Sequence, residues 1–160
     1  MEKQPKPKSP RDRAIRLLTT RDRTIEELRQ RLLKEGFSQQ EVEEVIVWCS
    51  EIGYLDDQRT AKQWVDNRNR FRPTGKHGLR MELRNKGVHE DTITKVMNSQ
   101  EGDYQLAKEL AKKRLATLGH IPVRKQYQRI GGLLSRRGFN WDVISQVLNE
   151  LFTSSLDTDL

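Results

Sequence analysis

The sequence repeats itself with a period of 51 residues. Three short breaks mark this period: Gly36-Phe37, Gly87-Val88 and Gly138-Phe139. The same offset aligns apolar positions on both sides of each break: Leu28 with Leu79 and Ile130, Leu32 with Leu83 and Leu134, and Ile46 with Met97 and Leu148. A repeat of this length indicates a chain built from small stacked units.

Each repeat predicts three helices. In the first repeat, capping boxes begin at Thr24 and Ser38, where a hydroxyl and a glutamate three residues later satisfy free amides of a helix start. Gly36, between them, is the residue type preferred after the last turn of a helix. The apolar residues that follow Ser38 recur at i, i+3, i+4 and i+7, which is one face of an α-helix. Sustained alternation of apolar and polar residues is absent, so we predict an all-α fold without strands.

Three such units in tandem are expected to form an elongated, curved array, because a unit of about 45 residues buries too little surface alone. The expected boundaries are a flexible basic tail over residues 1–10, three-helix repeats over 11–55, 56–102 and 103–152, and a flexible tail over 153–160.

The composition excludes several classes of protein. No apolar run approaches the ~18 residues of a membrane span, and the N-terminal residues have no apolar signal-peptide region. The single Cys49 excludes an internal disulfide and a cysteine-built zinc site. The three histidines are scattered, and no nucleophile has a base beside it. We therefore expect a cytoplasmic monomer that binds a partner, with no catalytic residues, metal or cofactor.

Charge follows the repeat. The chain has 30 basic and 23 acidic residues, a net charge of +7. In each repeat the first two helices are basic and the third is acidic; residues 104–138, for example, hold 9 basic residues and 1 acidic residue. A surplus of this kind predicts a polyanionic partner.

The basic residues of repeats 2 and 3 form the candidate binding surface. In repeat 2, cations step by four from Arg72 through Lys76 and Arg80 to Arg84, with no acid on the stripe. Like charges at this spacing cost roughly 0.2–0.5 kcal/mol per pair, so an external anion is one explanation and a solvated, solubilising face is the other. The whole candidate set is Arg68, Arg70, Arg72, Lys76, Arg80, Arg84, Lys112, Lys113, Arg114, Arg124, Lys125, Arg129, Arg136 and Arg137.

Two other features have two interpretations each. Asp56 and Asp57 are either a metal-binding pair or, as we prefer, caps of the first helix of repeat 2. Trp48, Trp64 and Trp141 either stack on nucleic-acid bases or pack between helices, and packing is favoured for at least two of them.

One segment resembles a known family. The pattern Gly53-Tyr54-Leu55-Asp56-Asp57-x-x-x-Ala61-x-x-Trp64-Val65-x-x-Arg68 is similar to the signature of RecX, the bacterial regulator of the RecA recombinase. Supporting matches are Leu28-x-x-x-Leu32-x-x-x-Gly36, its counterpart ending at Gly87, and residues 133–139. The resemblance covers roughly residues 11–152 and implies largely structural roles for Gly53, Tyr54, Asp56, Asp57, Ala61 and Trp64.

The resemblance implies tandem three-helix repeats that bind the groove of the RecA–DNA filament. It also implies inhibition of filament growth, ATP hydrolysis, strand exchange and co-protease activity in the SOS response. RecA on single-stranded DNA is then the expected partner, with single- or double-stranded DNA as a possible direct contact and no membrane. The alternatives are a sequence-nonspecific DNA-binding module, whose affinity falls steeply with salt, and a protein adaptor indifferent to DNA.

Overall fold

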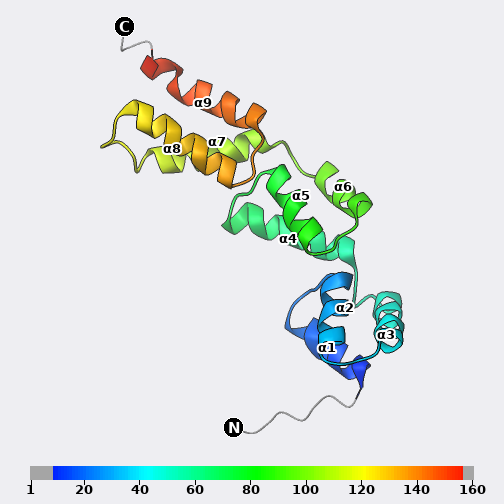
Figure 1. The fold of residues 1–160 in the computed structure, drawn as a ribbon. Helices are drawn as coiled ribbons and strands as arrows, with labels where there is room; N and C mark the ends of the chain where they lie inside the picture. Colours follow the sequence, from blue (N-terminus) through cyan, green and yellow to red (C-terminus); the bar gives the residue numbers. More distant parts are fainter. Residues whose placement is uncertain (1–8, 157–160) are drawn as a thin grey trace, which may run out of the picture. The chain divides into compact units, whose positions relative to one another are not determined.

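The computed structural model describes residues 9–156, and within this range the chain forms nine α-helices and no strands (Figure 1). The helices are α1 (Pro10–Thr20), α2 (Ile25–Lys34), α3 (Gln39–Glu51), α4 (Asp57–Phe71), α5 (Lys76–Asn85), α6 (Glu90–Asn98), α7 (Asp103–Leu115), α8 (Val123–Arg136) and α9 (Trp141–Leu156). The all-α class and the three tandem three-helix repeats are confirmed. The curvature of the array stays a prediction.

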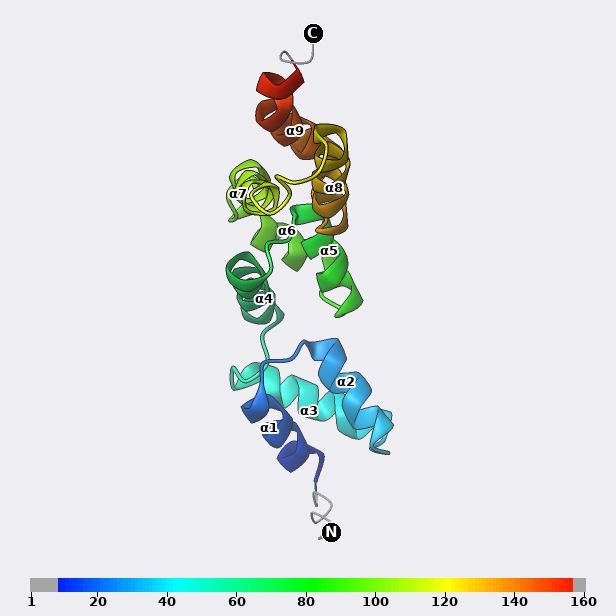
Figure 2. The same cartoon turned by 90° about the vertical axis from the view of Figure 1, so that its left-hand side faces the viewer.

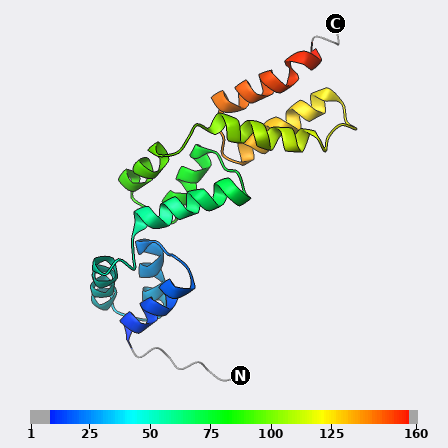
Figure 3. The same ribbon diagram turned by 180° about the vertical axis from the view of Figure 1, so that it is seen from behind.

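The chain forms two compact units, and the boundary between them falls within the middle repeat. The first consists of Met1–Gln63 and Leu83–Val96, and the second of Trp64–Glu82 and Met97–Leu160. In the first unit α1, α2 and α3 pack together (Figure 3). In the second, α7, α8 and α9 do the same (Figure 2).

The predicted periodicity places the core. In the first unit Leu28, Leu32 and Val42 are fully buried in one apolar cluster with Cys49. In the second unit Ile130, Leu134 and Val147 belong to the corresponding cluster, which also includes Phe152. Four of these residues, Leu28, Leu32, Ile130 and Leu134, are positions that the 51-residue offset aligned, and each of them loses its solvent contact. Such burial is the main source of stability of each bundle.

Local signals set the helix ends. The Thr24 hydroxyl accepts a hydrogen bond from the Glu27 amide at 3.1 Å, and the Ser38 hydroxyl accepts one from the Glu41 amide at 3.2 Å. Both predicted capping boxes are present. The glycine of each break has a left-handed backbone, with φ of 96° at Gly36, 80° at Gly87 and 77° at Gly138.

The terminal helices are longer than expected. Ser9 caps α1, so this helix starts at Pro10, a residue we had assigned to the N-terminal tail. The last helix continues past residue 153 to Leu156, because Phe152 is buried against the core and anchors its final turns. The remainder of both predicted tails, residues 1–8 and 157–160, lies outside the described residues.

The start of the second helix is the point at which consecutive repeats meet. At the first junction, Asp57 accepts a hydrogen bond from the Ile25 amide at 2.8 Å, and the Thr24 hydroxyl donates to the Lys86 carbonyl at 2.6 Å. These bonds give partners to an amide at the start of α2 and to a carbonyl just after the end of α5, two groups that helix ends leave unsatisfied.

The second junction repeats the arrangement. Asp103 accepts from the Lys76 amide at 2.8 Å. The Gly75 amide donates to the Arg137 carbonyl at 2.7 Å, and the Gly78 amide donates to the Gly138 carbonyl at 3.2 Å. At both junctions, the first residue of the first helix of one repeat therefore caps the second helix of the repeat before it.

This arrangement corrects the expectation for one of the two aspartates. Asp56 caps α4 as predicted, because it accepts from the amides of Gln58 and Arg59 at 3.0 and 3.2 Å. Asp57 caps α2 instead, because the free amide of Ile25 lies within reach of its carboxylate. Among residues 9–156 no group of three metal-ligating side chains comes together, at this pair or elsewhere.

Asp103 provides a test of the junction. Burial raises the pKa of its carboxyl, against the opposing effects of the Lys76 amide and the Lys76 charge. A raised pKa means that the ionised carboxylate costs stability, and this cost grows as pH rises from below the unfolded pKa through the folded pKa. Asp103→Asn keeps the acceptor and removes the charge, so its free energy of unfolding at neutral pH should equal or exceed that of the parent.

Asp103→Ala removes the acceptor and should lower the free energy of unfolding by about 1–2 kcal/mol. Urea denaturation of the three proteins at neutral and acidic pH measures both effects. The difference between Asp103→Asn and the parent should disappear once the parent's carboxyl is protonated. If asparagine destabilised as much as alanine, the charge of Asp103 and not its acceptor would hold the junction.

Candidate functional site

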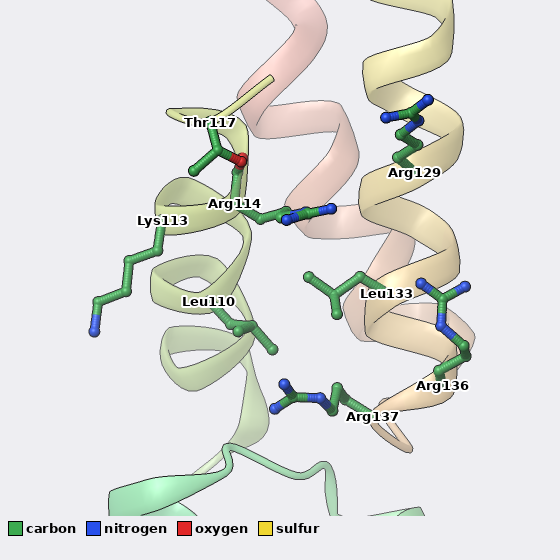
Figure 4. Close-up of a pocket in the computed structure, with 8 residues that line it drawn as sticks. All are labelled: Leu110, Lys113, Arg114, Thr117, Arg129, Leu133, Arg136 and Arg137. Carbon is green, nitrogen blue, oxygen red and sulfur yellow. The ribbon is translucent and has the colours of Figure 1, made fainter. Parts of the chain in front are cut away.

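The basic residues of repeat 3 surround a groove between α7 and α8. Its volume is about 590 Å³ (Figure 4). The residues that line it are Leu110, Lys113, Arg114, Thr117, Arg129, Leu133, Arg136 and Arg137. Five of the eight repeat-3 residues in the predicted binding surface are thus brought to one place.

Helical spacing builds the two walls of the groove. On α7, Leu110 and Arg114 are four residues apart and share a face. On α8, Arg129 and Leu133 have the same spacing. The core faces of these two helices bury Ala107, Ala111, Ile130 and Leu134. The groove-lining residues therefore face solvent.

The floor of the groove is apolar and its walls are cationic. Figure 4 shows Leu110, Arg114, Leu133 and Arg137 pointing into the space between the helices, while Lys113 points away from α8. Both leucines are half-buried. A ligand in the groove would therefore contact apolar surface beneath it and guanidinium groups beside it.

No acid lines the groove. Within residues 9–156, the side chains of Lys113, Arg114, Arg129 and Arg136 make no ion pair and no hydrogen bond. Uncompensated cations placed close together repel one another, and a bound anion removes this cost. The groove is therefore suited to an anionic ligand.

Among the four arginines that line the groove, Arg137 is the one whose guanidinium is held by a hydrogen bond within the described part of the chain. Its Nη1 donates to the Pro73 carbonyl at 3.2 Å. Burial lowers the pKa of Arg137, and the cations Arg72 and Arg68 lower it further. Both of these cations are repeat-2 arginines that belong to the second unit, as Arg137 does.

The other three predicted residues of repeat 3 lie elsewhere. Lys112 and Lys125 are exposed on α7 and α8, outside the groove lining. Arg124 lines a separate cavity of about 380 Å³, beside Tyr127 and Phe152.

The prediction that no acid accompanies the basic stripe of repeat 2 is wrong at the C-terminal end of the stripe. Arg84 makes two hydrogen bonds to Glu90, at 2.8 and 2.9 Å, because the next helix supplies an acid that the spacing along α5 does not reveal. Arg80 is half-buried on α5. The Lys76 ammonium donates to the Gln100 carbonyl at 3.4 Å.

Arg68 is also used within the fold. Its Nε donates to Glu82 at 3.0 Å, and its guanidinium lies 4.4 Å from the ring centre of Trp64. The Trp64 indole donates to the same carboxylate at 2.6 Å. Arg68 and Arg84 of repeat 2 are therefore paired with carboxylates of the same repeat, in contrast to the cations of the groove in repeat 3.

An exposed aromatic at the end of α4 was not singled out from the sequence. Phe71 has 75% of its surface exposed, and the Arg70 guanidinium lies 5.9 Å from its ring centre. Arg72 follows it directly. The signal that points to Phe71 is an aromatic residue between two arginines where a helix gives way to a proline-containing loop.

The remaining residues of the signature segment lie in different environments. Gly53 takes a left-handed turn after α3, Ala61 is fully buried, and Tyr54 is half-exposed. Of the other two tryptophans, Trp48 is half-buried beside Arg11, whose guanidinium lies 4.4 Å from the ring centre, while Trp141 is 68% exposed. None of the helices described is long and apolar enough to cross a lipid bilayer.

Models of a known protein family match most of the chain. Models of the first, second and third three-helix domains of RecX match residues 11–49, 56–97 and 101–148. The chain belongs to the RecX family. The three matches follow one another in the order of the repeats, and the family members named below are regulatory proteins.

Individual RecX relatives match over nearly their full length. The chain is 33% identical over 146 residues to the regulatory protein RecX of Pelodictyon phaeoclathratiforme, covering 91% of both chains. It is 34% identical over 142 residues to that of Vibrio parahaemolyticus, covering 88% of this chain and 90% of the relative. The crystal structure of RecX from Lactobacillus salivarius has the same fold, with a TM-score of 0.79 at 19% identity over 89% of this chain and 94% of that one.

Proposed function

We propose that this chain is a negative regulator of the RecA recombinase. As a cytoplasmic monomer it would bind the groove of the RecA–DNA filament and inhibit filament growth, ATP hydrolysis, strand exchange and co-protease activity. Membership of the RecX family, with all three domains present in order, is the observation that carries the proposal.

The distribution of charge fits a filament partner. The filament offers a repeating surface, and three linked repeats can each contribute a weak contact, so that affinity accumulates through effective concentration. The acid-free groove of repeat 3 would face an anionic part of the filament. The acidic third helices would face basic surface on RecA.

ATP hydrolysis by RecA tests this proposal. RecA is first assembled on single-stranded DNA, and the chain is then titrated in at two salt concentrations. We expect inhibition at well below one copy per RecA subunit, largely retained at moderate salt. A filament regulator acts substoichiometrically because each molecule bridges several subunits or blocks growth.

A sequence-nonspecific DNA-binding module is the alternative, and the unpaired cations of the groove favour it. In that case inhibition would appear only when the chain saturates the DNA, and it would fall steeply with salt through counterion release. That result, or no inhibition, would contradict the RecA proposal.

A further inference from the structure

The groove of repeat 3 has the features of a phosphate-binding channel. Guanidinium groups line both walls, Lys113 adds an ammonium group on the α7 side, and among the lining residues there is no carboxylate. Four of the five cations are arginines, whose planar donor fork matches phosphate oxygens in pairs. A chain of phosphodiesters carries one negative charge per unit, so it can satisfy cations on both walls in succession.

The apolar floor adds a second preference. Half-buried Leu110 and Leu133 lie between the cationic walls and point into the groove (Figure 4). They provide no donor or acceptor for a base edge and no aromatic face. The groove itself therefore contacts the sugar–phosphate backbone and does not read sequence.

An exposed aromatic ring lies near the groove. Pro73, whose carbonyl accepts from Arg137 at 3.2 Å, is two residues after Phe71. Two residues span at most about 7 Å. Phe71 is 75% exposed, has arginines on both sides in the sequence, and lies along the chain within this distance of the Pro73 that a groove residue contacts.

An aromatic ring in this position distinguishes single strands from duplexes. Bases in a duplex are stacked on one another, whereas an unpaired base can stack on a protein ring. A run of protein carboxylates would occupy the cations without using Phe71. An unpaired base that stacks on Phe71 would cover this exposed side chain when the ligand binds.

We propose that this chain binds single-stranded nucleic acid directly, with its phosphates in the α7–α8 groove and an unpaired base stacked on Phe71. The inference deepens the proposed function by naming the ligand of the basic surface and the repeat that carries it. It concerns a contact to the nucleic acid alone, so it can be tested without RecA.

Fluorescence anisotropy with three labelled ligands tests the inference: a short oligothymidylate, an abasic oligomer of the same length, and a duplex. The full chain is compared with Phe71→Ala, Phe71→Leu and Trp141→Ala. Trp141→Ala is the matched control, because it removes another exposed aromatic of the same unit. Circular dichroism establishes that each variant is folded, which is expected because Phe71 is mostly exposed.

We expect Phe71→Ala to weaken binding of oligothymidylate on the order of ten-fold, since stacking on one aromatic ring has an effect of this size. The Phe71→Leu variant should bind oligothymidylate nearly as weakly as Phe71→Ala does, because leucine keeps apolar area but has no aromatic ring. Binding of the abasic oligomer and of the duplex should not change, and Trp141→Ala should match the parent on all three ligands.

Three results would overturn the inference. The first is unchanged oligothymidylate binding by Phe71→Ala. The second is an equal loss on the abasic oligomer, which would indicate a structural role for Phe71. The third is competition by polyglutamate as strong, per charge, as that by oligothymidylate, which would indicate an acidic protein as the ligand. The RecA titration described above succeeds or fails independently of all three.

Discussion

Gly138→Ala is expected to lower the free energy of unfolding by about 2–5 kcal/mol. The left-handed backbone of Gly138, with φ of 77°, costs an alanine about 1–2 kcal/mol. The added Cβ would also lie 2.4 Å from Gly78 Cα and 2.6 Å from Gly78 N, so backbone has to move. Inserting an extra carbon atom into a packed region typically costs a further ~1–3 kcal/mol, because the neighbouring backbone has to shift.

Gly36→Ala is the matched control for this prediction. Gly36 ends the equivalent helix with φ of 96°, yet among the described residues no atom lies within 4 Å of a Cβ placed there. Gly36→Ala should therefore lower the free energy of unfolding only by the backbone strain, about 1–2 kcal/mol. Urea denaturation followed by circular dichroism compares the two variants.

Hydrogen exchange adds a local measurement. The amides of Gly75 and Gly78 donate to the Arg137 and Gly138 carbonyls, so they should lose protection in Gly138→Ala. They should keep it in Gly36→Ala. Equal destabilisation by the two substitutions, with protection of these amides unchanged, would contradict the close junction between the repeats.

The largest functional effect is expected from the groove. The double variant Arg114→Gln/Arg129→Gln removes one cation from each wall, and it should weaken binding to single-stranded DNA on the order of ten- to a hundred-fold at low salt. Because each phosphate contact to a single strand contributes about 0.7 to the salt dependence, the slope of log affinity against log salt should become shallower by about 1.4. Titrations over a series of salt concentrations measure both quantities.

Lys112→Gln/Lys125→Gln is the matched control. It removes the same net charge from the same two helices, at exposed positions outside the groove. We expect only a small effect that follows from net charge. If both double variants lost affinity and slope equally, binding would depend on overall charge and the groove would not be a site.

The sequence predicts the fold well because its signals are local and repeated. Leu28, Leu79 and Ile130 occupy one register, and each of them is buried as the periodicity requires. The capping boxes at Thr24 and Ser38 need only residues three positions away, so their geometry follows from the sequence.

Features that depend on contacts between helices are predicted less well. Spacing along α5 shows Arg84 in a row of cations, but its partner Glu90 comes from the following helix. Asp57 was expected to cap its own helix, and the free amide that it binds belongs to Ile25, 32 residues earlier. Phe71 was missed because exposure, which separates it from a core residue, is a property of the folded chain.

Arg137 has two roles that connect stability to binding. Its guanidinium lines the groove, while its main-chain carbonyl holds the amide of Gly75 at the junction between repeats 2 and 3. Thermodynamic linkage is reciprocal, so a ligand that favours the ordered position of Arg137 also favours the closed junction, and by the same factor. Occupancy of the groove would therefore stiffen the joint between the last two repeats, and a loosened joint would weaken the hold on the ligand.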